Sequence, residues 1–159
     1  MKNTDMLETT LCYIENNGRV LMLHRVKKKE DINKGKWIGI GGKLETGETP
    51  LKCIIREAKE ETGLQLLNPV LRGIVYFNSD LYPSEKMYLF TCTEFKGTLK
   101  ECDEGILKWI EKEKILSLPL WEGDKIFLKA LNRGETNFEL TLDYNGDTLV
   151  SHKIKQLPQ

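Results

Sequence analysis

The segment 42–64, GKLETGETPLKCIIREAKEETGL, constrains this chain more than any other. Pro50 suits the first position of a helix, and either Thr46 or Thr49 suits the cap before it. Gly63 suits the position just past the helix end, where a left-handed residue closes the last turn. These signals predict a helix that begins at Pro50 and ends just before Gly63.

This helix, expected over 50–62, carries an apolar stripe with an acidic face beside it. At about 100° per residue, the stripe expected to face the core consists of Leu51, Ile54, Ile55, Ala58 and Thr62. Three glutamates, Glu57, Glu60 and Glu61, fall within an arc of about 100° next to that stripe. The basic residues of the helix lie mostly on the remaining side, so we expect the three carboxylates to be neighbours without cations between them.

Placing three acidic residues in the last turns of a helix is costly. The carbonyl end of the helix dipole disfavours anions by roughly 0.3–1 kcal/mol each, and mutual repulsion adds to this cost. Oxygen ligands three and four residues apart suit Mg²⁺, which takes one or two carboxylates together with waters and substrate phosphates. An isolated acidic face is usually only solvated. Here Glu48, Arg56 and a glycine pair accompany it, which favours a divalent-metal site.

The glycine and charged positions of this segment resemble the signature of the Nudix hydrolases. The positions that carry the resemblance are Gly42, Glu48, Arg56, Glu57, Glu60, Glu61, Gly63 and Leu64. Ala58 departs from the pattern, because the family usually has a bulkier aliphatic residue there, but this concerns helix packing. The resemblance implies a hydrolase of nucleoside diphosphates linked to another group. It also implies Mg²⁺ or Mn²⁺ held by Glu57, Glu60 and Glu61, with Gly42 in the same metal site.

The same resemblance implies roles for other residues. Arg56 would pair with Glu48 and orient the metal-binding carboxylates. Glu104, just ahead of a predicted strand, resembles an extra acidic residue that reaches the metals from a loop in some members; an ordinary turn residue is the alternative. The general base that activates the attacking water stays open among Glu60, Glu61 and Glu104.

Several stretches outside the signature resemble the members that hydrolyse oxidised purine nucleoside triphosphates, the 8-oxo-dGTP diphosphatases. The stretches are Trp37 with Gly39, Gly41, Gly42 and Lys43; Asp103-Glu104 followed by Trp109; and Leu120-Trp121 through Asp124. Carried over, Trp121 would stack on the base and Asp124 would bond to its edge. A core-capping aromatic is an equal alternative for Trp121. Lys43, Arg25 and Ile38 complete the expected substrate-binding set.

Two departures put this substrate in doubt. Ile38 stands where the mammalian-type enzymes place a base-reading Asn, and Gly123 stands where they have the first of two Asp residues. Base recognition is therefore expected to be altered or broader. Tyr82 and Pro83 resemble residues of diadenosine-polyphosphate and ADP-ribose hydrolases, although both also suit a hairpin turn.

Two further functions remain open from the sequence. A nucleotide-sensing module that has lost turnover would usually lack a signature carboxylate, and none is lost here. Hydrolysis at the 5′ end of RNA would require a basic surface. With 24 basic and 24 acidic residues the chain has a formal net charge of zero, which provides no field for nucleic-acid polymers but allows small nucleotides.

Composition predicts a single domain over 1–159. With 159 residues and 40% hydrophobic content, the chain can bury one core but not two ordinary ones. Its four cysteines form no C-x-x-C pair, which argues against disulfide or zinc frameworks and fits reduced thiols in the cytoplasm. No segment has the ~20 apolar residues of a membrane span, and the first residues lack the apolar region of a signal peptide. We expect a cytoplasmic protein, either monomer or homodimer.

The rest of the chain alternates between periods of two and of about 3.6 residues. Strands are predicted over 7–14, 19–26, 66–77, 86–95, 106–110, 138–142 and 149–154, and helices over 112–116 and 121–131. A short strand is expected within 37–43, after a charged loop over 27–36 that either lies over phosphates or is only solvated. This order predicts a mixed sheet with helices on its faces, the same α/β/α sandwich that the family resemblance implies.

Overall fold

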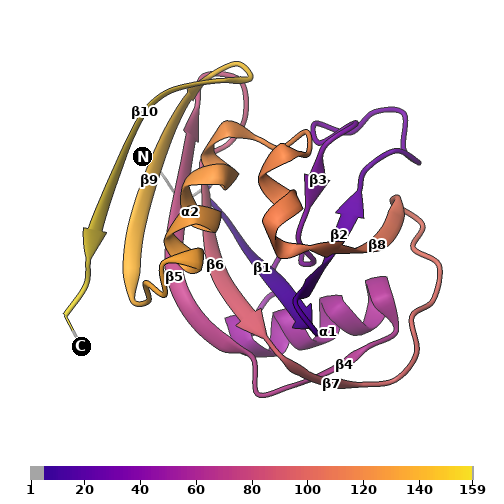
Figure 1. Ribbon diagram of the computed structural model, residues 1–159. Coiled ribbons are helices and arrows are strands. Elements are labelled where there is room, and N and C mark those ends of the chain that lie inside the picture. Colours follow the sequence, from indigo (N-terminus) through magenta and orange to yellow (C-terminus); the bar gives the residue numbers. More distant parts are fainter. Residues whose placement is uncertain (1–5, 159) are drawn as a thin grey trace.

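One mixed eight-stranded β-sheet forms the centre of the computed structural model, which describes residues 6–158 (Figure 1). Its strands are β1 (Leu7–Asn16), β2 (Arg19–His24), β3 (Trp37–Ile38), β5 (Val70–Ser79), β6 (Glu85–Cys92), β8 (Ile106–Glu111), β9 (Phe138–Asn145) and β10 (Thr148–Gln156). The strand order is β10-β9-β5-β6-β1-β2-β3, and β8 also pairs with β2. The pairs β1–β6 and β5–β9 are parallel and the others are antiparallel.

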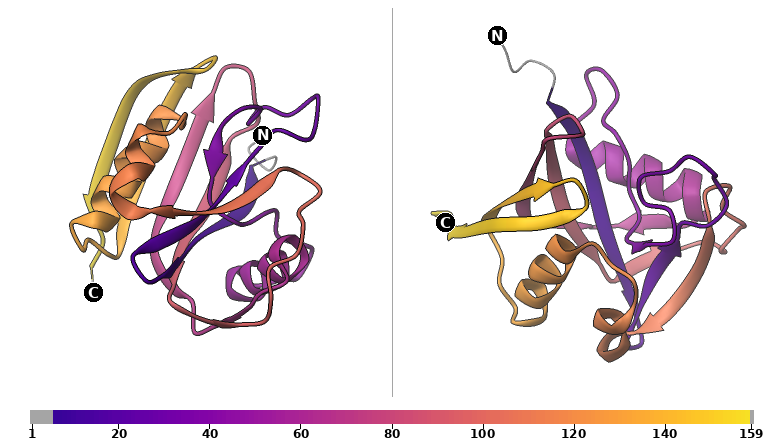
Figure 2. Two further views of the ribbon diagram at one scale, coloured as in Figure 1. Left: turned by 45° about the vertical axis from the view of Figure 1, so that its right-hand side comes forward. Right: turned by 90° about the horizontal axis from the view of Figure 1, so that it is seen from above.

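Two α-helices cover opposite faces of the sheet. They are α1 (Pro50–Thr62) and α2 (Glu122–Asn132), and a 3₁₀ helix, η1 (Lys112–Ser117), precedes α2. Seen from above in Figure 2, α1 and α2 lie on opposite sides of β1. Neighbouring residues of β1 accordingly point into different cores: Tyr13 packs with the cluster under α2, whereas Ile14 packs with the cluster under α1. The predicted mixed sheet flanked by helices is confirmed.

The helix that carries the acidic residues has the predicted bounds. Thr49 is its N-cap, and the Thr49 side chain accepts a hydrogen bond from the backbone N–H of Lys52 at 3.2 Å. Gly63 closes the helix in the left-handed region at φ 83°. The predicted apolar stripe was wrong at Leu51, whose side chain is 46% exposed. Cys53 is buried in the first turn instead, because its sulfur faces Thr10 of β1 at 3.3 Å.

Three predicted elements differ in the structure. The strand predicted over 66–77 divides into β4 (Gln65–Leu67) and β5, because Asn68 takes a positive φ of 54° between them. The strand predicted over 86–95 likewise divides into β6 and β7 (Glu94–Lys96), and β7 pairs with β4 in a separate two-stranded sheet. The helix predicted over 112–116 is the 3₁₀ helix η1. The segment is too short for its hydrogen bonds to offset the free-energy cost of nucleating an α-helix. Within residues 6–158, no helix is both long enough and apolar enough to span a membrane.

Candidate active site

Arg56 is the centre of an ion-pair network on α1. Its Nε donates to Glu48 Oε2 at 2.7 Å and its Nη2 donates to Glu48 Oε1 at 3.0 Å, a two-point contact. Its Nη1 lies 3.1 Å from both Glu57 Oε2 and Glu60 Oε1. The hydrogen bonds from Arg56 lower the pKa of Glu48 to about 2. The predicted Arg56–Glu48 pair is therefore present in the structure.

One expectation about this helix was wrong. The glutamates were expected to be neighbours without cations between them, but Arg56 contacts both Glu57 and Glu60. The Arg56 side chain reaches across the helix surface because it is long and its planar guanidinium spans several carboxylates at once. Glu60 remains mostly solvent-exposed, at 58% of its side chain, whereas Glu57 is 16% exposed.

Glycines of the segment between β3 and α1 allow this backbone to lie close to Glu57 and Glu61. The backbone N–H of Gly41 donates to Glu61 Oε1 at 3.1 Å. A Cβ atom on Gly42 would lie 2.4 Å from the carboxyl carbon of Glu57, so a larger residue there would displace the Glu57 carboxyl group from its present position. The Gly42 carbonyl accepts a hydrogen bond from the Thr10 N–H at 2.8 Å. Its place as a metal ligand stays a prediction, and the feature that the structure describes is the space beside Glu57.

Glu104 lies in the loop between β7 and β8 and lines the same cavity as Glu57 and Glu61. Its Oε1 lies 3.0 Å from Arg25 Nη1, and its Oε2 lies 3.8 Å from Lys28 Nζ. Gly105 packs tightly on β2, since a Cβ there would lie 2.0 Å from the carbonyl oxygen of His24. This close packing holds Glu104 over the end of α1.

Charge at this end of the cavity is poorly compensated. Burial raises the pKa of Glu57, and the negative charges of Glu60 and Glu104 act in the same direction against Arg56. Burial raises the pKa of Glu61 to about 8, and the charges of Glu104 and Glu57 contribute to this rise. A group of carboxylates that raise one another's pKa in a partly dry site fits a divalent cation, which would reverse these shifts.

The carboxylates are not yet gathered around one point. Among residues 6–158, no three His, Cys, Asp or Glu side chains are close enough to hold a metal ion together. Arginines hold several of them instead: Arg56 binds Glu57 and Glu60, and Arg25 binds Glu104. The donor set fits the predicted metal, and its closure around the ion stays a prediction.

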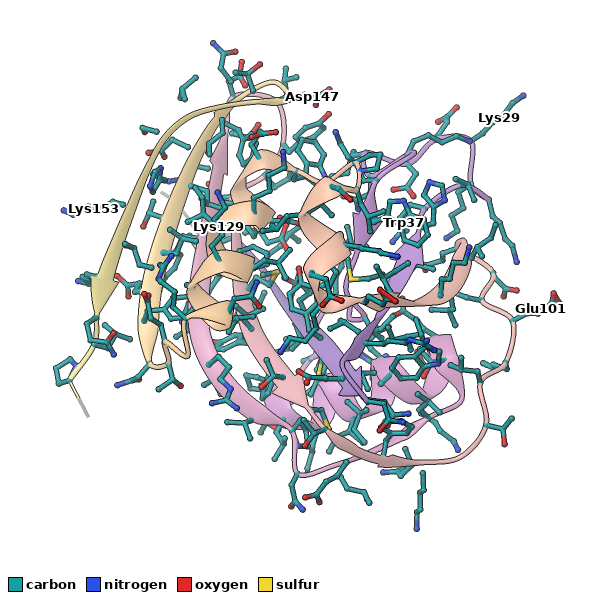
Figure 3. All side chains as sticks on the ribbon, in the orientation of Figure 1. Lys29, Trp37, Glu101, Lys129, Asp147 and Lys153 are labelled. Atoms are coloured by element: carbon teal, nitrogen blue, oxygen red, sulfur yellow. The ribbon has the colours of Figure 1, made fainter. Side chains whose placement is uncertain are left out.

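A cavity of about 500 Å³ runs from these acids to the N-terminus of α2. All of the residues predicted to bind substrate line it, namely Arg25, Ile38, Lys43, Trp121 and Asp124. Glu57, Glu61 and Glu104 line the same cavity, as do the alternative markers Tyr82 and Pro83. Side chains of the charged loop over 27–36 point in different directions. Ile32 and Asn33 line the cavity, whereas Lys29 points away from the molecule (Figure 3).

Trp121 is held in place from three directions. Its indole N–H donates to Asn33 Oδ1 at 2.7 Å, which ties the 27–36 loop to the start of α2. Its ring meets that of Tyr144 edge-on, with centroids 5.6 Å apart, and Lys36 Nζ lies 5.1 Å from its centroid. The ring still lines the cavity, so a lining aromatic describes it better than a core residue.

Asp124 is buried, with 5% of its surface exposed, and it lines the cavity from the first turn of α2. Burial raises its pKa to about 8; the negative charge of Glu85 adds to the rise and Lys36 opposes it. Sequence reasoning did not identify Glu85, Tyr144 or Asn33 as residues of this cavity. No local signal marks them, because each comes to the cavity through pairing or packing between distant segments.

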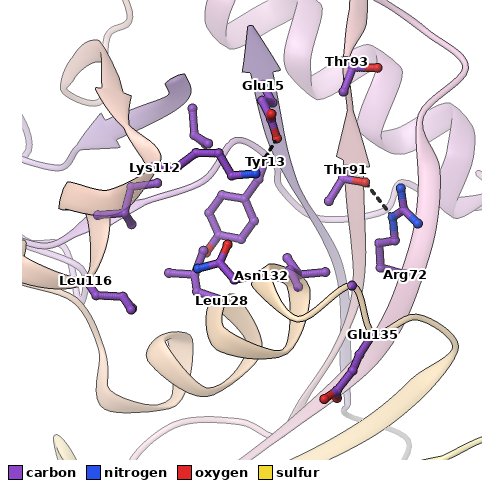
Figure 4. Close-up of a pocket in the computed structure, with 14 residues that line it drawn as sticks. Tyr13, Glu15, Arg72, Thr91, Thr93, Lys112, Leu116, Leu128, Asn132 and Glu135 are labelled. Carbon is purple, nitrogen blue, oxygen red and sulfur yellow. Dashed lines mark hydrogen bonds and ion pairs between the residues drawn. The ribbon is translucent and has the colours of Figure 1, made fainter. Parts of the chain in front are cut away.

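A second cavity, of about 200 Å³, lies toward the other end of β1 (Figure 4). Figure 4 shows Tyr13 pointing from β1 toward Leu128 and Asn132 of α2. Two interactions lie on its wall: Arg72 with Thr91 at 2.7 Å, and Lys112 with Glu15 at 3.1 Å. None of the predicted site residues lines this cavity, so the candidate active site is the larger one.

A mixed sheet with an acidic helix beside a large cavity indicates an enzyme. Similarity to known proteins identifies its family. The profile of the NUDIX domain matches residues 7–131. The uncharacterised Nudix hydrolase YvcI of Bacillus subtilis is 31% identical over 157 residues, covering 95% of this chain and 96% of that protein. This chain belongs to the Nudix hydrolase family, whose members act on phosphoric anhydride bonds.

Two further similarities are informative. The oxidized purine nucleoside triphosphate hydrolase of Danio rerio is 29% identical over 150 residues, covering 93% of this chain and 94% of that protein. The crystal structure of the MutT protein from Bacillus halodurans superposes with a TM-score of 0.85 at 31% identity, covering 96% of this chain and all (100%) of that one.

Proposed function

We propose that this Nudix hydrolase is a Mg²⁺-dependent pyrophosphohydrolase of nucleoside triphosphates, above all of oxidised purine deoxynucleotides such as 8-oxo-dGTP. The products would be the monophosphate and pyrophosphate. One observation carries the proposal: a single cavity joins the acidic residues of α1 to Trp121 and Asp124. Similarity to the Danio rerio oxidized purine nucleoside triphosphate hydrolase supports the substrate class.

The acidic end of the cavity would hold the metal and the phosphates. Glu57, Glu60, Glu61 and Glu104 are the proposed carboxylate ligands, and Mn²⁺ would substitute for Mg²⁺. The bound ions would neutralise phosphate oxygens and lower the pKa of a bound water. Arg56, through its contacts with Glu48, Glu57 and Glu60, would keep the carboxylates oriented.

Residues around that end would handle the phosphates and the proton. Lys43 and Arg25 line the cavity beside the acids and are the proposed phosphate contacts. Glu61 and Glu104 are the candidate bases, since both line the cavity, whereas the exposed Glu60 is held by Arg56. The base would stack on Trp121 and bond to Asp124.

A second substrate class has one observation in its favour. Tyr82 and Pro83 line the cavity rather than only forming a turn, so a larger substrate such as ADP-ribose or a dinucleoside polyphosphate would meet both. We also propose that 1–159 forms a single domain that acts in the cytoplasm on small nucleotides, as a monomer or homodimer.

A panel of substrates tests these proposals. Oxidised dGTP, dGTP, ADP-ribose and a diadenosine polyphosphate are each incubated with the protein and Mg²⁺, and the products are separated. Monophosphate with pyrophosphate from oxidised dGTP, formed faster than any product from ADP-ribose, is the expected result. Orthophosphate release, or preference for the dinucleotides, would contradict the triphosphate proposal. A Glu61→Gln sample run in parallel shows that the activity belongs to this site.

A further inference from the structure

Two carboxyl groups other than Glu57, Glu61 and Glu104 line the nucleotide cavity. Asp124 lies in the first turn of α2, and Glu85 is the first residue of β6. Both line the cavity, and Asp124 is almost fully buried. Within residues 6–158, neither carboxyl forms an ion pair; the more distant charges of Lys43 and Lys36 only partly oppose the rise in the pKa of Glu85 and of Asp124, respectively.

Glu85 is held with one oxygen free. Thr9 of β1 donates its hydroxyl hydrogen to Glu85 Oε2 at 2.6 Å, and the parallel pairing of β1 with β6 fixes this neighbourhood. Within the described part of the chain, Oε1 of Glu85 has no hydrogen-bond partner from the protein. A carboxylate positioned in this way can accept hydrogen bonds from a ligand without moving.

Few other groups near Asp124 can accept hydrogen bonds from a ligand. A side chain at position 123 is excluded, because a Cβ on Gly123 would lie 2.5 Å from Leu142 Cδ1 and 2.7 Å from the Tyr144 hydroxyl oxygen. Ile38 lines the cavity but offers no hydrogen bond, and Asn33 Oδ1 already binds Trp121. Glu85 is thus the second carboxyl beside Asp124, since both line the cavity and the charge of Glu85 acts on Asp124.

We propose that Glu85 is a specificity-determining residue that, together with Asp124, binds a purine edge carrying adjacent N–H donors, the 2-amino-6-oxo edge of guanine and its oxidised forms. This inference rests on the proposed nucleotide hydrolase function and adds the base class and the residue that selects it. Glu85 accepts hydrogen bonds from the 2-amino group. Asp124 bonds to the neighbouring N1–H and O6 atoms.

The electrostatics of the pair agree with this assignment. Burial, followed by the charge of Glu85, raises the pKa of Asp124 to about 8, so Asp124 keeps its proton at neutral pH. A protonated carboxyl presents one donor and one acceptor, which match O6 and N1–H of guanine. Hypoxanthine lacks only the 2-amino group, so it forms the Asp124 contacts and loses those to Glu85.

Equilibrium binding of dGMP and dIMP tests the inference without requiring turnover. Calorimetry should show that the wild-type protein binds dGMP at least about tenfold more tightly than dIMP. Glu85→Leu, which removes both acceptor oxygens, should reduce this ratio to within about threefold by weakening dGMP alone. Glu94→Gln on β7, an exposed carboxyl outside the cavity, should leave the ratio unchanged.

A second variant covers loss of folding. If Glu85→Leu has a lowered melting temperature, Glu85→Gln is measured instead. Its preference for dGMP over dIMP should be at least about threefold lower than that of the wild type, because a neutral acceptor binds less strongly than a charged one. Equal weakening of both nucleotides, or an unchanged ratio in the variants, would overturn the inference. Its failure is distinguishable from failure of the proposed function: discrimination without hydrolysis of any triphosphate leaves the inference standing, whereas hydrolysis with equal use of dGTP and dITP leaves only the function standing.

Discussion

The two ends of the large cavity manage buried negative charge in different ways. At the α1 end, arginines contact two of the acids: Arg56 binds Glu57, and Arg25 binds Glu104. Glu61 has no ion-pair partner among residues 6–158, and burial raises its pKa to about 8. At the α2 end, Asp124 and Glu85 have no ion-pair partner among residues 6–158; burial raises the pKa of both, and raises that of Asp124 to about 8. Carboxylates that are paired with arginines can bind a metal ion in place of the arginines. Asp124, which keeps its proton at neutral pH, is suited to neutral hydrogen-bonding groups.

The largest expected effect comes from the α1 end. Glu57→Gln, Glu60→Gln and Glu61→Gln should each lower kcat by at least ~10²-fold, because each removes charge from the electrostatic centre of the reaction. Metal-free Glu57→Gln and Glu61→Gln should be as stable as the wild type or more so, since burial disfavours the charged form of both glutamates. Turnover and thermal melting without metal are the measurements. Lower melting temperatures with near-normal turnover in all three would mean that the glutamates are structural.

Arg56 tests whether orientation of the acids matters as much as their charge. Arg56→Ala should lower kcat by at least ~10-fold and also lower the melting temperature, because four carboxylates lose a shared partner. Arg56→Lys should rescue little, since an ammonium cannot reproduce the two-point contact with Glu48. Lys52→Ala, an exposed position on the same helix, is the control. Full activity in Arg56→Lys would reduce Arg56 to a simple positive charge.

The α2 end should respond in binding rather than in chemistry. Trp121→Ala should weaken purine nucleotide binding by roughly 1–3 kcal/mol, the usual range for a base stacked on an aromatic ring. Trp109→Phe is a matched control, because Trp109 packs on Phe95 in the α1-side core and does not line the cavity. Affinity is measured by titration of a monophosphate. Unchanged affinity in Trp121→Ala would place the base elsewhere and favour the ADP-ribose or dinucleotide proposals.

The last expected effect is on stability rather than on binding or turnover: the free energy of unfolding should depend on pH. The pKa of Asp124 rises on folding from its ordinary value of 3.8 to about 8. Between these values the unfolded chain releases a proton that the folded protein keeps, so the contribution of Asp124 to stability falls as pH rises from about 4 to about 8. Relative to Asp124→Asn, the wild type should lose at least about 1 kcal/mol over this window.

Denaturant unfolding at several pH values measures this difference. Asp147→Asn, a substitution at the exposed end of the terminal hairpin, should show no such trend (Figure 3). Parallel stability curves for the wild type and Asp124→Asn would mean that Asp124 is ionised at neutral pH, and the contrast between the two ends of the cavity would be lost.

Local signals were sufficient for the α1 end of this site. The cap at Thr49, the proline and the C-terminal glycine define α1 without reference to the rest of the chain, and the helical period places its glutamates together. The mixed sheet followed from alternating periods and from the family resemblance. Burial of Cys53 in place of Leu51 was not predictable, because it depends on how α1 meets β1.

The α2 end depends on distant pairings that a sequence does not display. Glu85 reaches the cavity only because β6 pairs in parallel with β1, and Asn33 only because its loop folds back on Trp121. The α1 end has one such feature as well, because the pairing of Arg25 with Glu104 joins two segments that adjoin through β2 and β8. Resemblance to a family identified Trp121 and Asp124, whereas Glu85 occupies a position that neither pattern nor resemblance marked.

Paramagnetic NMR tests the division of the cavity most directly. Mn²⁺ is added to isotope-labelled protein, followed by 8-oxo-dGMP, and the backbone amides and the indole N–H signals of Trp37, Trp109 and Trp121 are recorded. We expect Mn²⁺ to broaden the amides of Gly41 and Gly42 first, and the nucleotide to shift the Trp121 indole while leaving that of Trp109 in place. Broadening centred away from α1, or a Trp121 signal that the nucleotide leaves unchanged, would contradict a cavity with a metal end and a base end.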